Sequence, residues 1–265
     1  MGIYIGTSGY FFPDWSKTFY PKGLSQRLWL RYYIMHFPAL ELNSTFYAIP
    51  PQERIEKLVS QLPDDFVLTV KIPRSITHEE PNKKELSDYI SELENAIAPA
   101  KDKQVFKGFL AQFPVSFRFS RKNFEKLKAI VEALTRPLFV EFRNSSWRNE
   151  ETMDFLKEND VGWVIPDVPA LPELTRTEPL VTTEVAYLRL HGRNAKNWYG
   201  GGDRYDYFYS DEELGEIAEL VRLISSWTKD TYVFFNNCHM GQAAINAKKF
   251  AKMFGQQFPQ GDLFE

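Results

Sequence analysis

The chain has 265 residues, of which 43% are hydrophobic and 15% aromatic, and its formal net charge is −3. This length fits one large domain, and the apolar fraction is sufficient for a large core. The slight negative charge argues against a nucleic-acid-binding surface spread over the whole protein. One cysteine excludes an internal disulfide, and no apolar run approaches the roughly 18 residues of a membrane span. We therefore expect one soluble, cytoplasmic domain over residues 1–265, with no signal peptide.

Eight strand-like runs that end in polar or charged residues recur along the chain, and helical periodicity separates most of them. Eight such units in this length are typical of a closed (β/α)₈ barrel, or TIM barrel, which takes about 250 residues. The active sites of these barrels lie at the carboxyl ends of the strands. In chain order we expect strands at Ile3–Ser8, Ala39–Asn43, Phe66–Lys71, Gly108–Phe113, Leu138–Arg143, Val161–Asp167, Val185–His191 and Tyr232–Asn237.

Helices are expected between most of these strands, but two connections differ. Four prolines between Pro166 and Pro179 leave no room for a full helix, so an irregular segment should join the sixth and seventh strands. The long loop Gly192–Tyr209 follows the seventh strand and is expected to act as a lid, with Ser210 or Asp211 capping the next helix. The helical patterns are Leu24–Met35, Glu53–Gln61, Leu86–Ile97, Phe124–Leu134, Glu150–Glu158, Leu214–Ile224 and Gln242–Phe254.

Side chains alternate between the two faces of a strand, and this alternation places charged residues inside the barrel. In the fifth strand the apolar Val140 and Phe142 should face the helices, so Glu141 and Arg143 should face the interior. A barrel interior is normally apolar, so this indicates either a satisfied ion network or a polar pocket. By the same parity the inward residues include Glu41, Asn43, Thr69, Lys71, Arg189 and His191, joined by Gln112, Asp167 and either Asn236 or Asn237.

These residue types suit two kinds of chemistry, anion binding and proton transfer. His191 suits general acid–base catalysis because the pKa of an unperturbed imidazole lies near neutrality. Glu41 and Glu141 form an acid/base pair if burial separates their pKa values. Three cations suit the binding of a phosphate or carboxylate, namely Lys71, Arg143 and Arg189. The remaining candidate ligand contacts are Asn43, Gln112, Asp167, Asn237 and His78.

A metal site is the weaker alternative. Glu141, Asp167 and His191 offer oxygen and nitrogen ligands on three consecutive strands. No HxH or HExxH spacing is present, however, and the two arginines nearby would oppose a cation. We therefore expect no cofactor and no metal, and keep a divalent metal as the alternative.

Short motifs spread over nearly the whole chain carry a further signal. They are Gly6–Gly9, Trp15, Phe19–Pro21, Glu41–Tyr47, Lys71–Arg74, Thr77–His78, Gln112–Pro114, Glu141–Arg143, Trp147, Arg189–Gly192, Phe235–Asn237 and Asn246–Ala247. In this order they resemble the motifs of the YecE-like family, the domain of unknown function 72, although Tyr10 stands where the family often has Trp. The resemblance implies a TIM barrel and brings no established activity, substrate or cofactor.

The sequence therefore predicts an enzyme with a polar pocket at the carboxyl-terminal mouth of the barrel. It would act on a small polar, anionic ligand, such as a phosphorylated or carboxylated sugar derivative, by hydrolysis or isomerisation with acid–base chemistry. The alternative is a non-catalytic protein that binds a phosphorylated metabolite or nucleic acid, with loop aromatics stacking on bases; the net charge weighs against nucleic acid. A third reading is a scaffold for a partner protein. No membrane partner is expected, and the oligomeric state is not indicated.

Overall fold

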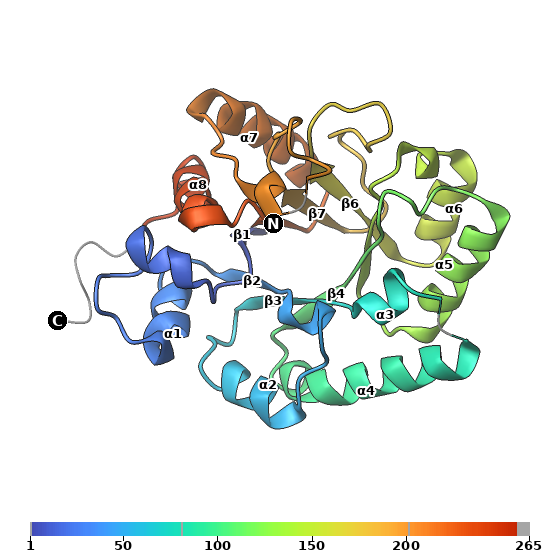
Figure 1. Cartoon of the computed structure of the whole chain (residues 1–265), viewed down its shortest axis with the longest axis horizontal. Coiled ribbons are helices and arrows are strands. Elements are labelled where there is room, and N and C mark those ends of the chain that lie inside the picture. Colours follow the sequence, from blue (N-terminus) through green and yellow to red (C-terminus); the bar gives the residue numbers. More distant parts are fainter. Residues whose placement is uncertain (1, 81, 201, 259–265) are drawn as a thin grey trace.

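Eight parallel strands close into a barrel in chain order in the computed structural model, which describes residues 2–80, 82–200 and 202–258 (Figure 1). Each strand pairs in parallel with its neighbour in sequence, and β1 closes the ring against β8. The predicted (β/α)₈ fold is thus confirmed. The strands are β1 (Gly2–Ser8), β2 (Ala39–Leu42), β3 (Val67–Lys71), β4 (Phe106–Gln112), β5 (Leu138–Glu141), β6 (Val161–Asp167), β7 (Val185–Leu190) and β8 (Asp230–Phe235).

Helices surround the barrel, as Figure 1 shows. The α7 helix begins at the predicted Ser210 N-cap, whose hydroxyl accepts from Glu213 N while the Glu213 side chain accepts from Ser210 N. None of the helices in the described part of the chain is long and apolar enough to cross a membrane. The helices are α1 (Trp29–Ile34), α2 (Gln52–Val59), α3 (Arg74–Thr77), α4 (Lys83–Asp102), α5 (Arg121–Ala133), α6 (Glu150–Glu158), α7 (Asp211–Ser225) and α8 (Gln242–Lys252).

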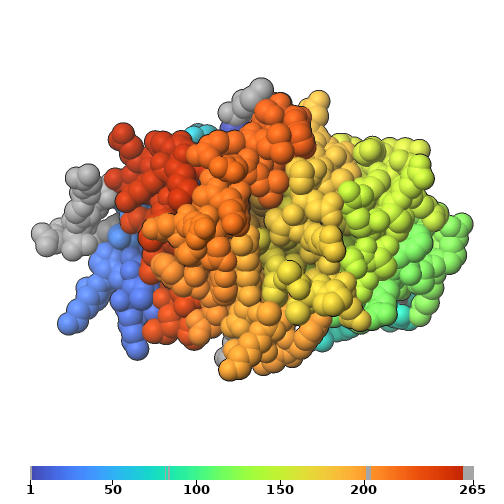
Figure 2. Space-filling view, turned by 90° about the horizontal axis from the view of Figure 1, so that it is seen from above, coloured from blue at the N-terminus to red at the C-terminus, as the bar shows by residue number. Residues whose placement is uncertain are grey.

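The segment between β6 and β7 contains no helix over residues 168–184, all of which are described. The hydroxyl of Thr182 accepts from Trp163 N at 2.7 Å and donates to Val161 O at 2.6 Å, so this side chain holds the irregular segment against the backbone of β6. In Figure 2 this yellow segment lies between the yellow-green side of the molecule and the orange region that includes α7. The predicted irregular, proline-rich connection is confirmed, and a cavity forms beneath it.

The barrel interior is divided into an apolar lower layer and a polar upper layer. The polar layer begins two residues after the apolar layer on several strands. Glu41 lies two residues after Ala39 in β2, and Glu141 lies two residues after Phe139 in β5. The apolar plug beneath leaves the polar layer open only toward the carboxyl ends of the strands. The plug consists of Ala39, Val67, Leu110, Phe139, Val164, Tyr187, Tyr232 and Phe234.

Candidate functional site

A buried arginine between two glutamates forms the floor of the polar layer. Arg189 donates from Nε to Glu41 Oε2 at 2.8 Å, from Nη2 to Glu41 Oε1 at 2.5 Å, and from Nη1 to Glu141 Oε2 at 2.7 Å. Tyr187 adds a hydroxyl donor to Glu41 Oε2 at 2.6 Å. Burial alone would lower the pKa of Arg189, but Glu41 and Glu141 outweigh it and raise that pKa. The guanidinium is therefore fixed in charge and in position.

A second group of polar side chains continues upward from Glu141. Its Oε1 accepts a hydrogen bond from Arg143 Nε and lies 3.1 Å from His191 Nε2. Burial alone would raise the pKa of Glu141, but Arg143, Arg189 and His191 hold it well below its usual range. Glu141 is therefore a carboxylate at neutral pH.

His191 completes this group as a neutral imidazole. Burial, assisted by the charge of Arg143, lowers the pKa of His191 well below its usual range, against the opposing effect of Glu141. The neutral ring satisfies its neighbours if Nε2–H donates to Glu141 and Nδ1 accepts from Asn236 Nδ2, 2.8 Å away, and from Arg143 Nη2, 3.3 Å away. This tautomer leaves His191 without a free proton acceptor in the direction of solvent.

Above these groups lies a cavity of about 740 Å³ at the mouth of the barrel. Seven of the eight strands contribute to it from their carboxyl ends, through Ser8, Asn43, Lys71, Gln112, Arg143, Arg189 and Asn236. The loops add walls and a rim, through Phe12, Phe46, Tyr47, Arg74, His78, Pro114, Val115, Trp198, Tyr199, Arg204, Tyr205 and Cys238. A scaffold with a closed mouth is therefore not favoured.

The charge of this cavity wall has one sign. Among the side chains that the structure describes, five cationic residues line the cavity and no aspartate or glutamate does. The cations are Lys71, Arg74, Arg143, Arg189 and Arg204. Three of them are paired with glutamates outside the lining, Arg74 with Glu79, Arg143 with Glu141, and Arg189 with Glu41 and Glu141. Among the described residues, Lys71 and Arg204 are the lining cations without a carboxylate partner.

Lys71 is the strand-end lining cation that has no carboxylate partner among the described residues. It ends β3 and donates from Nζ to Gln112 Oε1 at 2.9 Å, with Nζ also 3.9 Å from the centroid of the Phe46 ring. Among the described residues no acidic side chain forms an ion pair with it. Burial, followed by the charge of Arg189, lowers the pKa of Lys71 to about 7, although Glu141 and Glu41 act in the opposite direction.

His78 is a second titratable group on the same wall. Its Nδ1 atom lies 2.8 Å from the hydroxyl of Thr77, which fixes the ring beside Phe46. Burial, together with the charges of Lys71 and Arg74, lowers the pKa of His78 to about 4. The ring is therefore neutral at pH 7 and can accept a proton only in a strongly acidic medium or from a strong acid.

Unpartnered polar atoms gather at this cavity. Buried polar groups almost always have hydrogen-bond partners, so each exception calls for an explanation. Five described residues have a buried side-chain atom without a partner, and three of the five line the cavity, contributing Ser8 Oγ, Asn43 Oδ1 and Arg204 Nε. These atoms are available to a ligand.

The loop predicted to be a lid contributes lining residues to the cavity. Its Trp198 is only 3% exposed, and the Arg143 guanidinium lies 5.4 Å from the centre of the Trp198 ring. The loop leaves the barrel at Gly192, whose φ of +90° and close approach to Tyr207 exclude a larger residue. At its far end Tyr209 donates to Asp167 Oδ2 at 2.6 Å and accepts from Gly192 N at 2.8 Å.

The structure brings most of the sequence-predicted residues together but divides them between two depths. Lys71, Asn43, Gln112, Arg143, Arg189 and His78 line the cavity. Glu41, Glu141 and His191 lie in the buried layer beneath it and are not among its lining residues.

Asp167 and Asn237 face the other way. In β6 the inward residue is Val164, so Asp167, three residues later, points outward to Tyr209 and Arg193. Asn237 binds Tyr207 O and Asn246 Oδ1, and it is Asn236 that points into the cavity. Sequence reasoning did not assign four loop residues to the site. Tyr47 and Arg74 lie in the motifs that resemble the family, whereas no motif or periodicity marks Tyr199 and Arg204.

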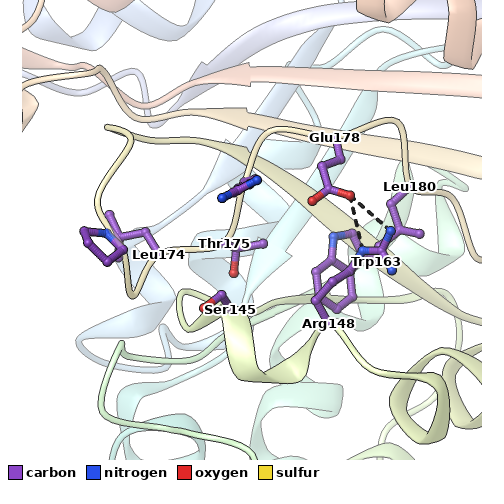
Figure 3. A pocket seen from close by; sticks show the side chains of 9 residues that line it. Ser145, Arg148, Trp163, Leu174, Thr175, Glu178 and Leu180 are labelled. Carbon is purple, nitrogen blue, oxygen red and sulfur yellow. Dashed lines mark hydrogen bonds and ion pairs between the residues drawn. The ribbon is translucent and has the colours of Figure 1, made fainter.

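A smaller cavity of about 320 Å³ lies outside the barrel, beneath the irregular segment after β6 (Figure 3). Figure 3 shows Glu178 bonded to Arg148 beside the ring of Trp163, and the Arg148 Nη2 to Glu178 Oε2 distance is 3.1 Å. The charges of this pair therefore compensate each other. Only one barrel strand residue, Trp163, contributes to the wall.

A metal site finds no support in the geometry. The described residues contain no group of three or more His, Cys, Asp or Glu side chains able to hold a metal ion. Of the three ligands considered from the sequence, Glu141 and His191 are adjacent, but Arg143 contacts both of them and Asp167 faces outward.

Comparison with known proteins identifies the family of the chain. Residues 4–263 match the family described as a protein of unknown function, DUF72. The UPF0759 protein YunF of Bacillus subtilis is 30% identical over 99% of this chain and 100% of its own length. The UPF0759 protein YecE of Escherichia coli is 34% identical over 29% of this chain and 26% of its own length.

Solved structures give the same result. A DUF72 family protein from Thermotoga maritima has a TM-score of 0.88 and 42% identity, covering 97% of this chain and 100% of that one. A DUF72 family protein from Enterococcus faecalis has a TM-score of 0.82 and 28% identity, covering 97% and 98%. The chain belongs to the DUF72 family, whose function is unknown.

Proposed function

We propose that the protein is an enzyme that binds a small anionic ligand, bearing a phosphate or carboxylate group, in the cavity at the barrel mouth. The observation that carries this proposal is the cationic wall, in which five Lys and Arg side chains face the cavity and no described acidic side chain does. Hydrogen bonds between ions are about twice as strong as neutral ones, and arginine can hold phosphate or carboxylate at two points.

The cations divide into fixed and available groups. Arg189 uses Nε, Nη1 and Nη2 on Glu41 and Glu141, so it contributes charge and supports the floor. Arg143 donates from Nε to Glu141, and its Nη2 atom lies 3.2–3.3 Å from the two ring nitrogens of His191, which leaves Nη1 for a ligand in the cavity, beneath Trp198. Arg204 has an unpartnered Nε, and we assign it to the anion together with Arg143.

We assign proton transfer to Lys71. A general base works best when its pKa is close to the operating pH, and the pKa of Lys71 is lowered to about 7. Glu41, Glu141 and His191 were the candidates from sequence, but the two carboxylates hold arginines and the histidine holds Glu141. We therefore propose that these three residues position Arg143 and Arg189 rather than exchange protons with the ligand.

A thermal-shift series tests the proposal. Inorganic phosphate and glycerol 3-phosphate should raise the melting temperature, because a ligand at about 100 times its dissociation constant adds roughly 2.7 kcal/mol to the free energy of unfolding. Glycerol, which lacks the charge, should not. Arg143→Gln should remove most of the shift, whereas Arg121→Gln on the outer helix α5 should keep it. Equal shifts for glycerol and glycerol 3-phosphate would contradict the proposal.

A second candidate function, binding of single-stranded nucleic acid, is favoured by the rim. Tyr47 and Tyr199 are 79% and 65% exposed and stand beside Arg74 and Arg204 at the cavity, an arrangement that suits stacking on bases. Binding of a fluorescent oligonucleotide should then weaken steeply as salt is raised. No binding at low salt would remove this candidate.

A non-catalytic binding role for a phosphorylated metabolite differs from our proposal only in turnover.

A further inference from the structure

We propose that Lys71 forms a protonated Schiff base with the carbonyl carbon of a small aldehyde or ketone that also carries a phosphate or carboxylate group. This inference rests on the proposed function, because the cationic wall would hold the anionic group while Nζ reacts with the carbonyl. It adds a covalent step and a substrate class that acid–base chemistry alone does not specify.

The position of Lys71 distinguishes it from the lysines on the outside of the barrel. Several of the outer lysines have an aspartate or glutamate partner, as in Lys101–Glu94, Lys122–Glu80, Lys128–Glu125 and Lys249–Asp211. Lys71 instead bonds an uncharged amide, Gln112 Oε1, and borders the cavity. An amine that must attack a carbonyl has to be both accessible from a pocket and free of a carboxylate that would keep it protonated.

Burial of Lys71 in the cavity wall favours its neutral form at physiological pH. Burial has the largest effect, and Arg189 and Arg143 also disfavour a further positive charge, whereas Glu141 and Glu41 favour it. The resulting pKa of about 7 leaves a large fraction of the amine unprotonated at neutral pH, in contrast to an ordinary lysine. His78 is neutral in this range and does not add a competing charge.

The reaction balances without an oxidant or reductant. The Nζ lone pair attacks the carbonyl carbon, a C–N bond forms, and the C=O pair moves to oxygen. A proton passes from nitrogen to that oxygen to give a neutral carbinolamine. A second proton, taken from solvent, lets the hydroxyl leave as water, and the nitrogen lone pair forms the C=N bond of the iminium ion.

Neighbouring groups suit each of these species. Gln112 Oε1 accepts an N–H bond from the amine and orients it. Ser8 Oγ and Asn43 Oδ1 are buried cavity groups without partners, and they can hydrogen-bond the hydroxyl of the carbinolamine. The Phe46 ring, 3.9 Å from Nζ, stabilises a cation there, and the iminium ion is such a cation.

Trapping with borohydride tests the inference. The protein is incubated with glyceraldehyde 3-phosphate at pH 7, reduced with sodium borohydride and analysed by intact and peptide mass spectrometry. We expect one adduct on the peptide that contains Lys71. Glyceraldehyde, which has the carbonyl without the anion, should label Lys71 more slowly by roughly tenfold or more, the value of one charge-assisted hydrogen bond. Glycerol 3-phosphate, which has the anion without the carbonyl, should give no adduct and should compete.

Two variants and one control lysine complete the design. Lys71→Arg keeps a cation without a primary amine, and Lys71→Met keeps the volume without charge; both should lose the adduct while melting cooperatively. Lys126 is the matched control, because burial also lowers its pKa but it does not line the cavity. Lys126→Arg should keep the adduct.

The outcomes separate the two proposals. If glycerol 3-phosphate stabilises the protein but neither aldehyde is trapped at Lys71, the Schiff base is refuted and anion binding stands. If both aldehydes label Lys71 equally and glycerol 3-phosphate neither binds nor competes, the reactive lysine stands and the anion-binding function fails. Adducts spread over Lys126 and other surface lysines, with none enriched at Lys71, would also overturn the inference.

Discussion

The Nζ atom of Lys71 lies 2.9 Å from the Oε1 atom of Gln112, on the adjacent strand. This pairing of a cation with a neutral amide, inside a wall of other cations, is the unusual electrostatic feature of the cavity. It leaves the charge of Lys71 uncompensated at short range, so the pKa of this lysine depends on what occupies position 112.

Gln112→Glu should bring the pKa of Lys71 closer to that of an ordinary lysine. A carboxylate at this distance favours the ammonium form and should raise the pKa of Lys71 by roughly one to three units. The rate at which a small aldehyde with cyanoborohydride modifies Lys71 at pH 7 should then fall about tenfold or more, with a midpoint at higher pH. Gln112→Met, which removes the acceptor without adding charge, should not raise the midpoint. An unchanged pH profile in Gln112→Glu would show that position 112 does not control Lys71.

Arg189→Met should destabilise the protein strongly. Arg189 is 1% exposed and pairs with Glu41 and Glu141, which are both fully buried, so its loss leaves Glu41 without a cationic partner and Glu141 with Arg143 alone. Removing one partner of a buried ion pair typically costs about 3–5 kcal/mol. Urea denaturation measures the free energy of unfolding. Arg121→Gln, which breaks the exposed pair with Glu151, should change it by less than about 1 kcal/mol. Similar effects of the two substitutions would mean that the floor is not an ion network.

Glu141 should make the protein sensitive to acid. Its pKa is lower in the folded than in the unfolded state, where it is near 4.5, so the unfolded state binds more protons as pH falls. The stabilising contribution of Glu141 is complete above that value and is lost as pH falls toward the folded pKa. Glu141→Gln should therefore flatten the loss of unfolding free energy between about pH 5 and pH 3, and Glu212→Gln on the surface of α7 should not. A wild-type slope in Glu141→Gln would rule out this linkage.

Tyr209→Phe should loosen the loop over the cavity. The Tyr209 hydroxyl joins Asp167 to Gly192, and the lost bond to a carboxylate is worth about 1.5–3 kcal/mol. Hydrogen exchange of residues 193–200 should speed up, and phosphate affinity should fall because this loop carries Arg204. Tyr89→Phe on the outer helix α4 serves as the control. Unaltered exchange and affinity would show that Tyr209 does not anchor a lid.

The alternation of side chains along strands predicted the site where one face of the strand was clearly apolar. In β5 and the two residues that follow it, the apolar Val140 and Phe142 face outward, and Glu141 and Arg143 face inward. The alternation predicts which face of the strand a side chain lies on, but not how deep that side chain lies in the barrel. It did not separate the cavity wall, where Lys71 stands, from the closed layer that contains Glu141.

The alternation is unreadable where both faces are apolar. Trp163, Val164 and Ile165 are all apolar, so the inward phase of β6 could not be fixed, and the outward position of Asp167 followed only from the structure. The same ambiguity in β8 left Asn236 and Asn237 unresolved. Loop residues such as Arg204 have no periodicity, and their place at the cavity depends on how the loop folds back over the barrel.

Titration calorimetry of glycerol 3-phosphate into the wild-type protein and into Arg143→Gln tests the central claim most directly. We predict binding at one site in the wild type and affinity weakened by roughly 10- to 100-fold in the variant, because a charge-assisted hydrogen bond contributes about 1.5–3 kcal/mol. No binding to the wild type, or equal affinity in the two proteins, would contradict an anion site at the barrel mouth.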